Sequence, residues 1–400
     1  DFSQIRDVLK SIDVGDKPKM IVAKTLKGKG ISFIEDKEGW HGKALSGEDF
    51  EKAIEELGVI DISVVGEIQK PEKVIEKKAI LKVDIGDLAY KIGEEVATRK
   101  AYGSALAKLG GKNEQIVSLD GETSNSTFSE MFREKHPERY FEMYIAEQNM
   151  VGVSLGLSKR GKIPFASTFA AFLTRAFDQI RMSAYSQGNI KLVGSHSGVS
   201  IGEDGPSQMG LEDIAMFRAV FDSVILCPSD AVSCEKLVAE AANVEGLVYL
   251  RTARPATPVI YKVSESFKIG GSKVIRKSDD DKLTIVSCGV CVNESLKAAE
   301  ILSKEGINVR VIDAYSIKPL DSVSILKAAL ETNNTIVCVE DHYEEGGLGD
   351  AVLNVFAGDA LAHVFKLAVS KLPRSGKGDE LLSFEGISSE KIADFIRNLK

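Results

Sequence analysis

The residues best suited to chemistry lie together in one glycine-rich loop, Gly194 to Met209. The loop carries an imidazole at His196, a carboxylate at Asp204 and an amide at Gln208, set among glycines and a proline. Glycine lets the backbone approach a ligand closely, and polar chemistry is commonly displayed on loops of a rigid scaffold. A solvated surface loop needs neither a histidine nor a hydrophobic strand leading into it. The loop therefore predicts a binding or catalytic site.

Composition describes a soluble globular protein with two or three domains, because 44% of the 400 residues are hydrophobic and 28% are charged. The five cysteines lie in apolar runs at irregular intervals, which indicates buried free thiols in a reducing compartment and predicts a cytoplasmic protein. Cys288 and Cys291 have the spacing of a redox or metal pair. No further cysteine or histidine lies nearby in the sequence, so core packing is the preferred interpretation.

The net charge of −8 argues against a face that binds nucleic acid, while small anions remain possible ligands. No stretch approaches the roughly 18 apolar residues that a spanning helix needs, and no signal peptide is recognisable, so no membrane partner is expected. The chain begins with Asp1, and its first strand-like run, Met20 to Lys24, has no core before it. We therefore expect an amino-terminal part to be missing.

From Asp120 onward, strand-length apolar runs alternate with helix-periodic segments, which predicts an α/β fold with a parallel sheet covered by helices. Strands are predicted at Ile116 to Leu119, Pro164 to Ser167, Ile190 to Gly194, Ser223 to Cys227 and Leu247 to Arg251. Helices are predicted at Gln148 to Ser158, Ala170 to Ser186, Leu211 to Ala219 and Asp230 to Ala242.

The alternation resumes after a looser, charged stretch that ends at Asp281, and predicts a second α/β domain. Its predicted strands are Leu283 to Ser287, Val309 to Asp313, Thr335 to Val339 and Val364 to Ala368. Its predicted helices are Val292 to Lys304, Ser322 to Leu330, Gly349 to Phe356 and Ser388 to Asn398. Gly346 to Gly349 form a weak glycine cluster, and without a fuller fingerprint dinucleotide binding is not favoured.

Ahead of both domains we expect a strand at Lys19 to Thr25 and a short helix after Ser46, with Asp49 completing a capping box. The lysine-rich tract that follows reads as a linker. The domain boundaries expected are residues 1–45 for the end of a first domain, 46–92 for the linker, 93–258 for the middle domain and 270–400 for the carboxyl-terminal domain.

In open parallel sheets, ligands bind beyond the carboxyl ends of the strands. The polar candidates follow strands: Glu122 to Ser126, Thr168 and Phe169, the glycine loop, and Arg251 to Arg254. We expect them to meet at one edge of one sheet.

Several long motifs occur in one order along the chain. They are Lys24 to Gly30, Trp40 to Lys43, Ala97 to Gly103, Ile145 to Met150, Ser167 to Phe172, Asp178 to Met182, the Gly194 loop, Arg251 to Pro255 and Val339 to Tyr343. From about Lys17 to the end, the sequence resembles transketolase, most closely the eukaryotic cytosolic form. The resemblance implies a thiamine diphosphate-binding fold, with a pyrimidine-binding domain followed by a separate carboxyl-terminal domain.

By this resemblance, the chain takes part in moving a two-carbon ketol unit from a ketose phosphate to an aldose phosphate in the pentose phosphate pathway. Glu147 matches the glutamate that activates the cofactor's pyrimidine ring. Phe169 and Phe172 match residues that hold that ring, and Gln208 matches a residue near its amino group.

Two residues of the first segment also match the family. Lys27 and His41 correspond to residues that reach the cofactor and the reacting oxygens of the substrate, with His41 expected to act in catalysis. The ligands of the metal ion, Mg²⁺ or Ca²⁺, are expected before Asp1, so no metal ligand is assigned within this chain. His136, His342 and His363 have no match in the catalytic set.

The sugar phosphate requires positive charge and fork-shaped donors. Arg99, Ser126, His196 and Arg254 match the residues that receive the substrate phosphate. Asp204 resembles the aspartate that accepts a substrate hydroxyl and sets stereochemical preference.

The family is homodimeric, with each site shared between subunits, so the resemblance implies a homodimer. Alone, this chain is expected to be inactive. Two alternatives remain: a catalytically silent, transketolase-like subunit that pairs with an active partner, and half of another thiamine diphosphate enzyme, such as a 2-oxo-acid dehydrogenase β chain or deoxyxylulose phosphate synthase.

Overall fold

The computed structural model describes residues 1–12, 15–17, 19–59, 61–69, 82–358 and 362–399. The chain divides into two compact units, Asp1–Glu76 and Lys77–Lys400. Within the described residues, no helix has the length and apolar character needed to cross a membrane.

The first unit has little core. It contains the helices α1 (Phe2–Ser11) and α2 (Glu48–Leu57), and Ala53 is the one buried side chain among its described residues. The strand predicted at Lys19 to Thr25 is wrong, because this segment has no regular structure and Met20 and Val22 are each 88% exposed. A strand needs a neighbour to complete its hydrogen bonds, and none is present here among the described residues.

The helix predicted after Ser46 is confirmed as α2, but the capping box is wrong. Gly47 occupies the N-cap with φ 56° and ψ −133°, and no side chain caps the helix. Ser46 therefore lies one residue outside the position from which its hydroxyl could accept the first backbone N–H groups. Part of the predicted linker, residues 70–81, lies outside the described residues.

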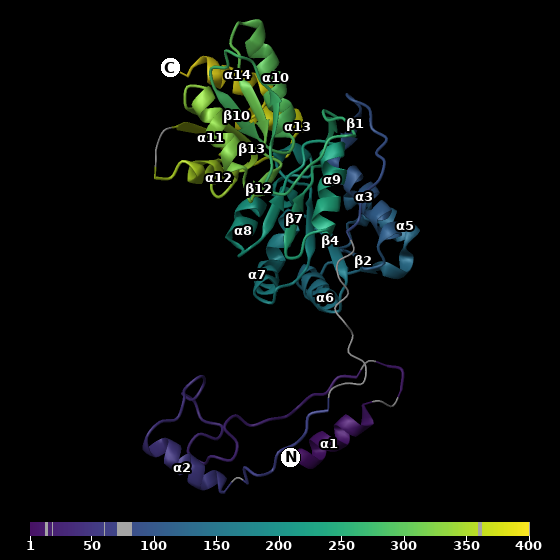
Figure 1. Ribbon diagram of the computed structural model, residues 1–400, viewed down its shortest axis with the longest axis vertical. Helices are drawn as coiled ribbons and strands as arrows, with labels where there is room; N and C mark the ends of the chain where they lie inside the picture. Colours follow the sequence, from purple (N-terminus) through teal and green to yellow (C-terminus); the bar gives the residue numbers. More distant parts are fainter. Residues whose placement is uncertain (13–14, 18, 60, 70–81, 359–361, 400) are drawn as a thin grey trace. The chain divides into compact units, whose positions relative to one another are not determined.

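The second unit is built on two main sheets (Figure 1). The seven-stranded sheet runs, in spatial order, β12 (Ser316–Lys318), β6 (Val224–Leu226), β7 (Val248–Arg251), β5 (Lys191–Ser195), β4 (Ile163–Phe169), β2 (Ile116–Asp120) and β3 (Tyr140–Glu142). Its strands pair in parallel except β12, which is antiparallel to β6. The predicted parallel sheet is thus confirmed, and β12 extends it with a strand from the later part of the chain.

The five-stranded sheet runs β14 (His363–Val369), β13 (Thr335–Tyr343), β10 (Thr284–Ser287), β11 (Arg310–Asp313) and β9 (Lys273–Arg276). All of its pairs are parallel except that between β11 and β9. The four strands predicted here are confirmed, with β13 longer than expected. A short ribbon pairs β1 (Glu95–Ala97) with β8 (Ala256–Pro258).

Helices cover both faces of each main sheet. The α-helices are α3 (Thr98–Lys112), α4 (Ser124–Thr127), α5 (Glu130–Lys135), α6 (Glu147–Lys159), α7 (Phe177–Tyr185), α8 (Asp213–Ala219), α9 (Ala231–Ala242), α10 (Cys291–Lys304), α11 (Ser322–Glu331), α12 (Leu348–Val355), α13 (Gly378–Glu385) and α14 (Ser389–Arg397). The 3₁₀ turns are η1 (Pro137–Arg139), η2 (Ala171–Ala176), η3 (Val199–Ile201) and η4 (Pro206–Gln208).

Successive side chains of a strand point to opposite faces of the sheet, so neighbouring residues pack against different helices. Along β5, Val193 packs in the cluster that holds α3 and α9, which lie side by side in Figure 1. Leu192 packs in the cluster that holds α6, α7 and α8. That second cluster also contains Ile312 and Ile336 of the five-stranded sheet, so one continuous hydrophobic core joins the two domains.

The predicted helix from Ala170 to Ser186 is only partly correct. Its first part is the 3₁₀ turn η2, and the α-helix α7 begins at Phe177. The hydroxyl of Thr174 donates to the carbonyl of Ala171 at 2.6 Å, which competes with regular helical hydrogen bonding. The helix α3, which carries Arg99, was not predicted.

Candidate active site

Polar loops follow four adjacent parallel strands, β7, β5, β4 and β2, and leave the sheet at the same edge. Arg254 follows β7, His196 follows β5, η2 with Phe172 follows β4, and Ser126 follows β2. The prediction that these segments meet at one sheet edge is therefore confirmed.

The glycine-rich loop is held by a residue of the other domain. Asp341, in β13, accepts hydrogen bonds from the backbone N–H groups of Val199 and Ser200 at 2.7 and 3.1 Å, and it is buried. Gly198 has φ +81°, and a Cβ there would overlap the Asp341 carboxylate. The glycine is thus required both by backbone conformation and by the close approach of its anchor. Through Asp341, the five-stranded sheet therefore holds the glycine-rich loop that follows β5 of the seven-stranded sheet.

His196 begins the loop in a left-handed conformation, with φ 57°. Its ring stacks on Phe169 at 3.8 Å between centroids, and its Nδ1 lies 3.0 Å from Ser195 Oγ. Burial, together with the nearby positive charges of Arg99 and Arg254, lowers the pKa of His196 to about 3. The imidazole is therefore neutral near pH 7, and it can offer one N–H to a ligand without adding charge.

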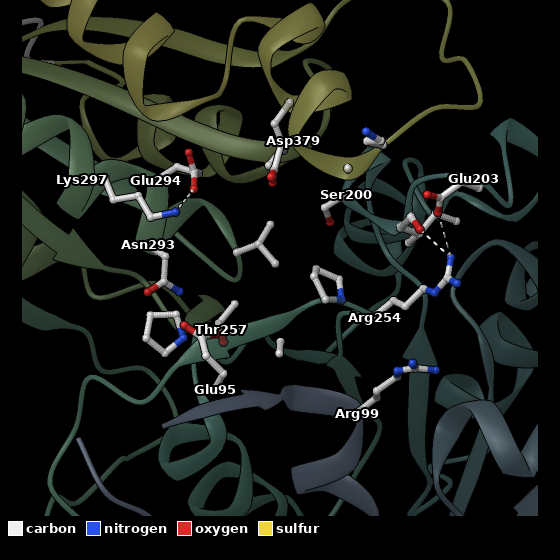
Figure 2. Close-up of a pocket in the computed structure, with 18 residues that line it drawn as sticks. Glu95, Arg99, Ser200, Glu203, Arg254, Thr257, Asn293, Glu294, Lys297 and Asp379 are labelled. Carbon is white, nitrogen blue, oxygen red and sulfur yellow. Dashed lines mark hydrogen bonds and ion pairs between the residues drawn. The ribbon is translucent and has the colours of Figure 1, made fainter. Parts of the chain in front are cut away.

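Two arginines and one aspartate form the charged part of the site. Arg254 Nη1 lies 3.3 Å from Asp204 Oδ1 and donates to the carbonyl of Ile201 at 2.7 Å. Arg99 Nη1 donates to the carbonyl of Ser126 at 2.9 Å. Figure 2 shows the guanidinium groups of Arg99 and Arg254 at the same end of the cavity drawn there. Burial lowers the pKa of Arg99, and repulsion from Arg254 lowers it further, while the charge of Asp204 acts in the opposite direction.

An aromatic stack adjoins this cluster. The ring of Phe169 is stacked with that of His196 and also with that of Phe172, with 5.0 Å between the phenyl centroids. The structure thus brings together Arg99, Ser126, Phe169, Phe172, His196, Asp204 and Arg254, all of which the sequence predicted for one site.

Glu147 is the first residue of α6 and is 1% exposed. Its Oε2 accepts a 2.7 Å charge-assisted hydrogen bond from Nη1 of Arg175, which belongs to η2, the same turn as Phe172. Gln208 ends η4, which also packs against η2. The turn η2 therefore connects the carboxylate, the aromatic stack and the end of the glycine loop.

Family profiles match most of this unit. The profile described as "Transketolase, pyrimidine binding domain" matches residues 94–259, and that described as "Transketolase, C-terminal domain" matches residues 272–392. A solved structure described as a split gene transketolase, inactive beta4 tetramer, is 37% identical with a TM-score of 0.69, over 76% of this chain and 98% of that chain. The chain belongs to the transketolase family.

Other relatives agree with this membership. Human transketolase is 50% identical over 393 residues, covering 96% of this chain and 62% of the relative. Bovine transketolase-like protein 1 is 51% identical over 383 residues, covering 94% of this chain and 64% of the relative. The chain thus spans less than two thirds of the length of these relatives. The structure of Campylobacter jejuni transketolase, with 21% identity and a TM-score of 0.81 over 100% of this chain and 66% of that chain, supports the fold alone.

The two candidates from the first unit lie together. Lys27 Nζ is 2.9 Å from His41 Nδ1, and both side chains are exposed. Because an ammonium group has no lone pair to accept a hydrogen bond, Nδ1 is the acceptor in this pair.

Two residues that support this candidate site were given no role in the sequence analysis, although Asp341 lies within the motif Val339 to Tyr343. Asp341 lies inside a strand and Arg175 inside a predicted helix, so neither lies in the loops that follow strands, where site residues were expected. The signal that could have found Asp341 is its place in the run Glu340, Asp341, His342, since three polar residues in a buried strand need partners.

The described residues contain no group of three or more His, Cys, Asp or Glu side chains arranged to hold a metal ion. All five cysteines are buried and free, as expected from their apolar surroundings. Burial is the main cause that raises the pKa of the Cys291 thiol, so this residue is not a poised nucleophile.

Proposed function

We propose that this chain supplies the pyrimidine-binding and carboxyl-terminal parts of a transketolase, which transfers a two-carbon ketol unit from a ketose phosphate to an aldose phosphate. The observation that carries the proposal is the joint placement of Arg99, His196, Asp204 and Arg254 beside the Phe169 stack. A cationic rim next to an aromatic surface suits a phosphorylated sugar reacting at a flat cofactor.

The described residues fit one half of thiamine diphosphate. Phe169 and Phe172 offer flat apolar area for the pyrimidine ring, and Gln208 offers an amide that can donate and accept. When bound, the cofactor supplies the carbon nucleophile and the electron sink for ketol transfer. In this proposal the carboxyl group of Glu147 would contact the pyrimidine nitrogen of the bound cofactor and exchange a proton with it. The hydrogen bond that Arg175 donates to Oε2 would orient that carboxyl group.

The two arginines are suited to a phosphate dianion. Arg99 and Arg254 repel one another, and a bound phosphate would relieve this repulsion while accepting hydrogen bonds from both. His196 adds a neutral N–H, and Ser126 adds a hydroxyl. In this proposal Asp204 accepts a substrate hydroxyl, so a sugar of the wrong configuration loses that hydrogen bond to the carboxylate.

The proposal includes a partner for this chain. The cofactor's diphosphate and its Mg²⁺ or Ca²⁺ would be held by a diphosphate-binding part, and the resemblance assigns Lys27 and His41 to the binding of cofactor and substrate. The active form would be a homodimer with shared sites, and this chain by itself would be inactive. The relative described as an inactive β4 tetramer supports that last point, because nearly all of its length is matched here.

The test is an assay of the assembled enzyme, meaning this chain together with the diphosphate-binding part in one polypeptide or supplied separately. With xylulose 5-phosphate, ribose 5-phosphate, thiamine diphosphate and Mg²⁺, we expect sedoheptulose 7-phosphate to form, and no product from this chain alone. Absence of product from the assembled enzyme would favour the silent transketolase-like subunit. Pyruvate consumption instead would favour the other thiamine diphosphate families.

A further inference from the structure

The last residue of β2, Asp120, is a buried carboxylate at the start of the segment that carries Ser126. This segment runs from Thr123 to Ser129 and contains the short helix α4, with Ser126 inside it. Because the side chain of Asp120 is fully buried, it cannot itself contact a substrate. Any influence that it has on the candidate site must act through the residues that it holds.

The carboxylate of Asp120 accepts four hydrogen bonds from this segment. Oδ1 accepts from the backbone N–H of Thr123 at 2.6 Å and from its hydroxyl at 3.0 Å. Oδ2 accepts from the hydroxyls of Thr127 at 2.7 Å and Ser129 at 2.8 Å. Burial raises the pKa of Asp120 to about 6, although these hydrogen bonds act in the opposite direction. The carboxylate is therefore mostly ionised at pH 7, and an ionised carboxylate only accepts hydrogen bonds, which matches its four donors.

Two of these hydrogen bonds come from the residues on either side of Phe128. Phe128 has φ 62° and ψ 16°, in the left-handed region that residues other than glycine rarely adopt. Such a conformation persists only where the surrounding structure holds it. The hydroxyls of Thr127 and Ser129 bind the same carboxylate oxygen, and so they fix the chain before and after this position. Asp120 therefore stabilises a backbone conformation that is unfavourable for phenylalanine.

The segment that Asp120 holds is also the support of Arg99. The guanidinium Nη1 of Arg99 donates to the carbonyl of Ser126 at 2.9 Å, and its Cζ lies 5.3 Å from the centre of the Phe128 ring. Arg99 lies in the first turn of α3, and this helix approaches the same segment at Gly103, where a Cβ would overlap the carbonyl oxygen of Phe128. The position of the Arg99 side chain thus depends on the segment from Thr123 to Ser129.

We propose that Asp120 is a positioning residue for the phosphate end of the substrate, acting through the segment Thr123 to Ser129 on Ser126 and Arg99. The inference rests on the proposed function, because it gives Asp120 a role in that same site. Without the carboxylate the segment would relax, and the Ser126 hydroxyl and the Arg99 guanidinium would lose their fixed positions. The segment contains none of the residues assigned to the cofactor, so the loss should fall on phosphate binding rather than on the ketol-transfer step.

The experiment compares a ketose with and without its phosphate as the donor for the assembled enzyme. KM is measured for xylulose 5-phosphate and for xylulose, with ribose 5-phosphate saturating for each variant. Asp120→Asn turns an N–H₂ group toward hydrogen-bond donors in either orientation of the amide, so we expect the KM for xylulose 5-phosphate to rise about five- to 20-fold. The KM for xylulose, and kcat with either donor, should stay within about twofold of the parent values.

Thr127 provides a second pair of variants that keeps the test open if Asp120→Asn folds poorly. Thr127→Val removes the hydroxyl that binds Oδ2 while keeping the shape of the side chain, and should raise the KM for xylulose 5-phosphate about two- to fivefold. Thr127→Ser restores the hydroxyl and should return KM to near the parent value. The matched control is Asp313→Asn, since Asp313 is also buried and accepts from hydroxyls, those of Ser229 and Tyr261. This variant should leave the ratio of the two KM values unchanged.

Binding of inorganic phosphate to the full 400-residue chain, measured by calorimetry, gives a readout that needs no turnover. Asp120→Asn should bind phosphate about five- to tenfold more weakly than the parent chain, and Asp313→Asn should bind it equally well. An assembled parent enzyme that turns over neither donor would count against the proposed function, while the phosphate affinities would still test the role of Asp120.

Three results would overturn the positioning role of Asp120. One is that Asp120→Asn and Thr127→Val raise the KM for both donors equally, which would indicate a general loss of structure. Another is that both variants leave the two KM values unchanged. The third is that the parent chain and Asp120→Asn show the same response to phosphate.

Discussion

The two main sheets of the second unit end in polar residues at their carboxyl edges, but they use these residues in opposite ways. At the seven-stranded sheet, Arg99, Asp204 and Arg254 are only partly buried. At the five-stranded sheet, Asp313 and Asp341 are buried and bonded to the neighbouring domain. The carboxyl edge of the seven-stranded sheet exposes the candidate site, and we call it the displaying edge. The carboxyl edge of the five-stranded sheet packs against the neighbouring domain, and we call it the docking edge.

This difference gives the second α/β domain a structural role, although the candidate site lies at the sheet edge of the first. Asp341 holds the glycine loop, and Arg251 links the same regions by donating to the carbonyls of Gly210 and Asp341. Arg251 also forms a buried ion pair with Asp213 at 2.7 Å. These contacts hold the glycine loop and its surroundings in place, so the carboxyl edge of the five-stranded sheet supports that of the seven-stranded sheet.

Removing an arginine from the displaying edge should have the largest effect on substrate binding. In the assembled enzyme, Arg254→Ala is expected to raise the KM for the sugar phosphate about 10- to 100-fold, because a charge-assisted hydrogen bond contributes about 1.5–3 kcal/mol. The effect on kcat should be smaller. Steady-state kinetics with both sugar phosphates provide the measurement.

The matched control removes an arginine that serves the docking edge. Arg218 donates to the carbonyls of Gly346 and Gly347 at 2.7 and 3.0 Å. Arg218→Ala should lower the free energy of unfolding and leave KM near the parent value. Equal KM changes in the two variants would remove the distinction between the edges.

Breaking the anchor between the edges should have an intermediate effect. Asp341→Asn leaves one of the two loop N–H groups facing an amide N–H₂, so we expect a loss of about 2 kcal/mol in the free energy of unfolding. Urea titration measures the loss, and the exposed Asp279→Asn serves as control. If the anchor also orients the loop, Asp341→Asn will raise KM as well. An unchanged unfolding free energy contradicts the anchoring role.

The smallest expected effect is a pH dependence at the docking edge. Burial raises the pKa of Asp313 to about 7, although Ser229 and Tyr261 donate to its Oδ2. The folded chain therefore binds this proton more tightly than the unfolded chain, and stability falls as pH rises from about 4 to about 7. The loss contributed by this group approaches about 1.4 kcal/mol per pH unit at most.

Asp313→Asn removes the titrating group while keeping an oxygen for Ser229 and Tyr261. Chemical unfolding at several pH values should give a shallower decline for this variant than for the parent chain between pH 4 and 7. Parallel declines would show that Asp313 does not carry the dependence.

Sequence reasoning predicted the displaying edge well, because its signals are local. Hydrophobic alternation located each strand, and loops that follow parallel strands must emerge at one edge. The same reasoning could not find the docking edge. Asp341 meets Val199 across 142 residues of sequence, a pairing that depends on how the two sheets pack.

Predictions from local sequence patterns were wrong in the first unit, where little tertiary packing stabilises the predicted elements. Met20 and Val22 resemble strand residues, yet no neighbouring strand is present in the described part of the first unit. Ser46 and Asp49 have capping-box spacing, but Gly47 takes the N-cap instead. Propensity predicts structure only when tertiary contacts agree with it.

The central claim is that Glu147 acts on the cofactor from the displaying edge, and the most direct measurement is ketol transfer by the assembled enzyme carrying Glu147→Gln. This change keeps the shape of the side chain, so we expect the enzyme to fold and to lose at least about 100-fold in kcat. Glu114→Gln, the same change at an exposed position, should retain parent activity. If Glu147→Gln turns over sugar phosphates at the parent rate, the account is contradicted.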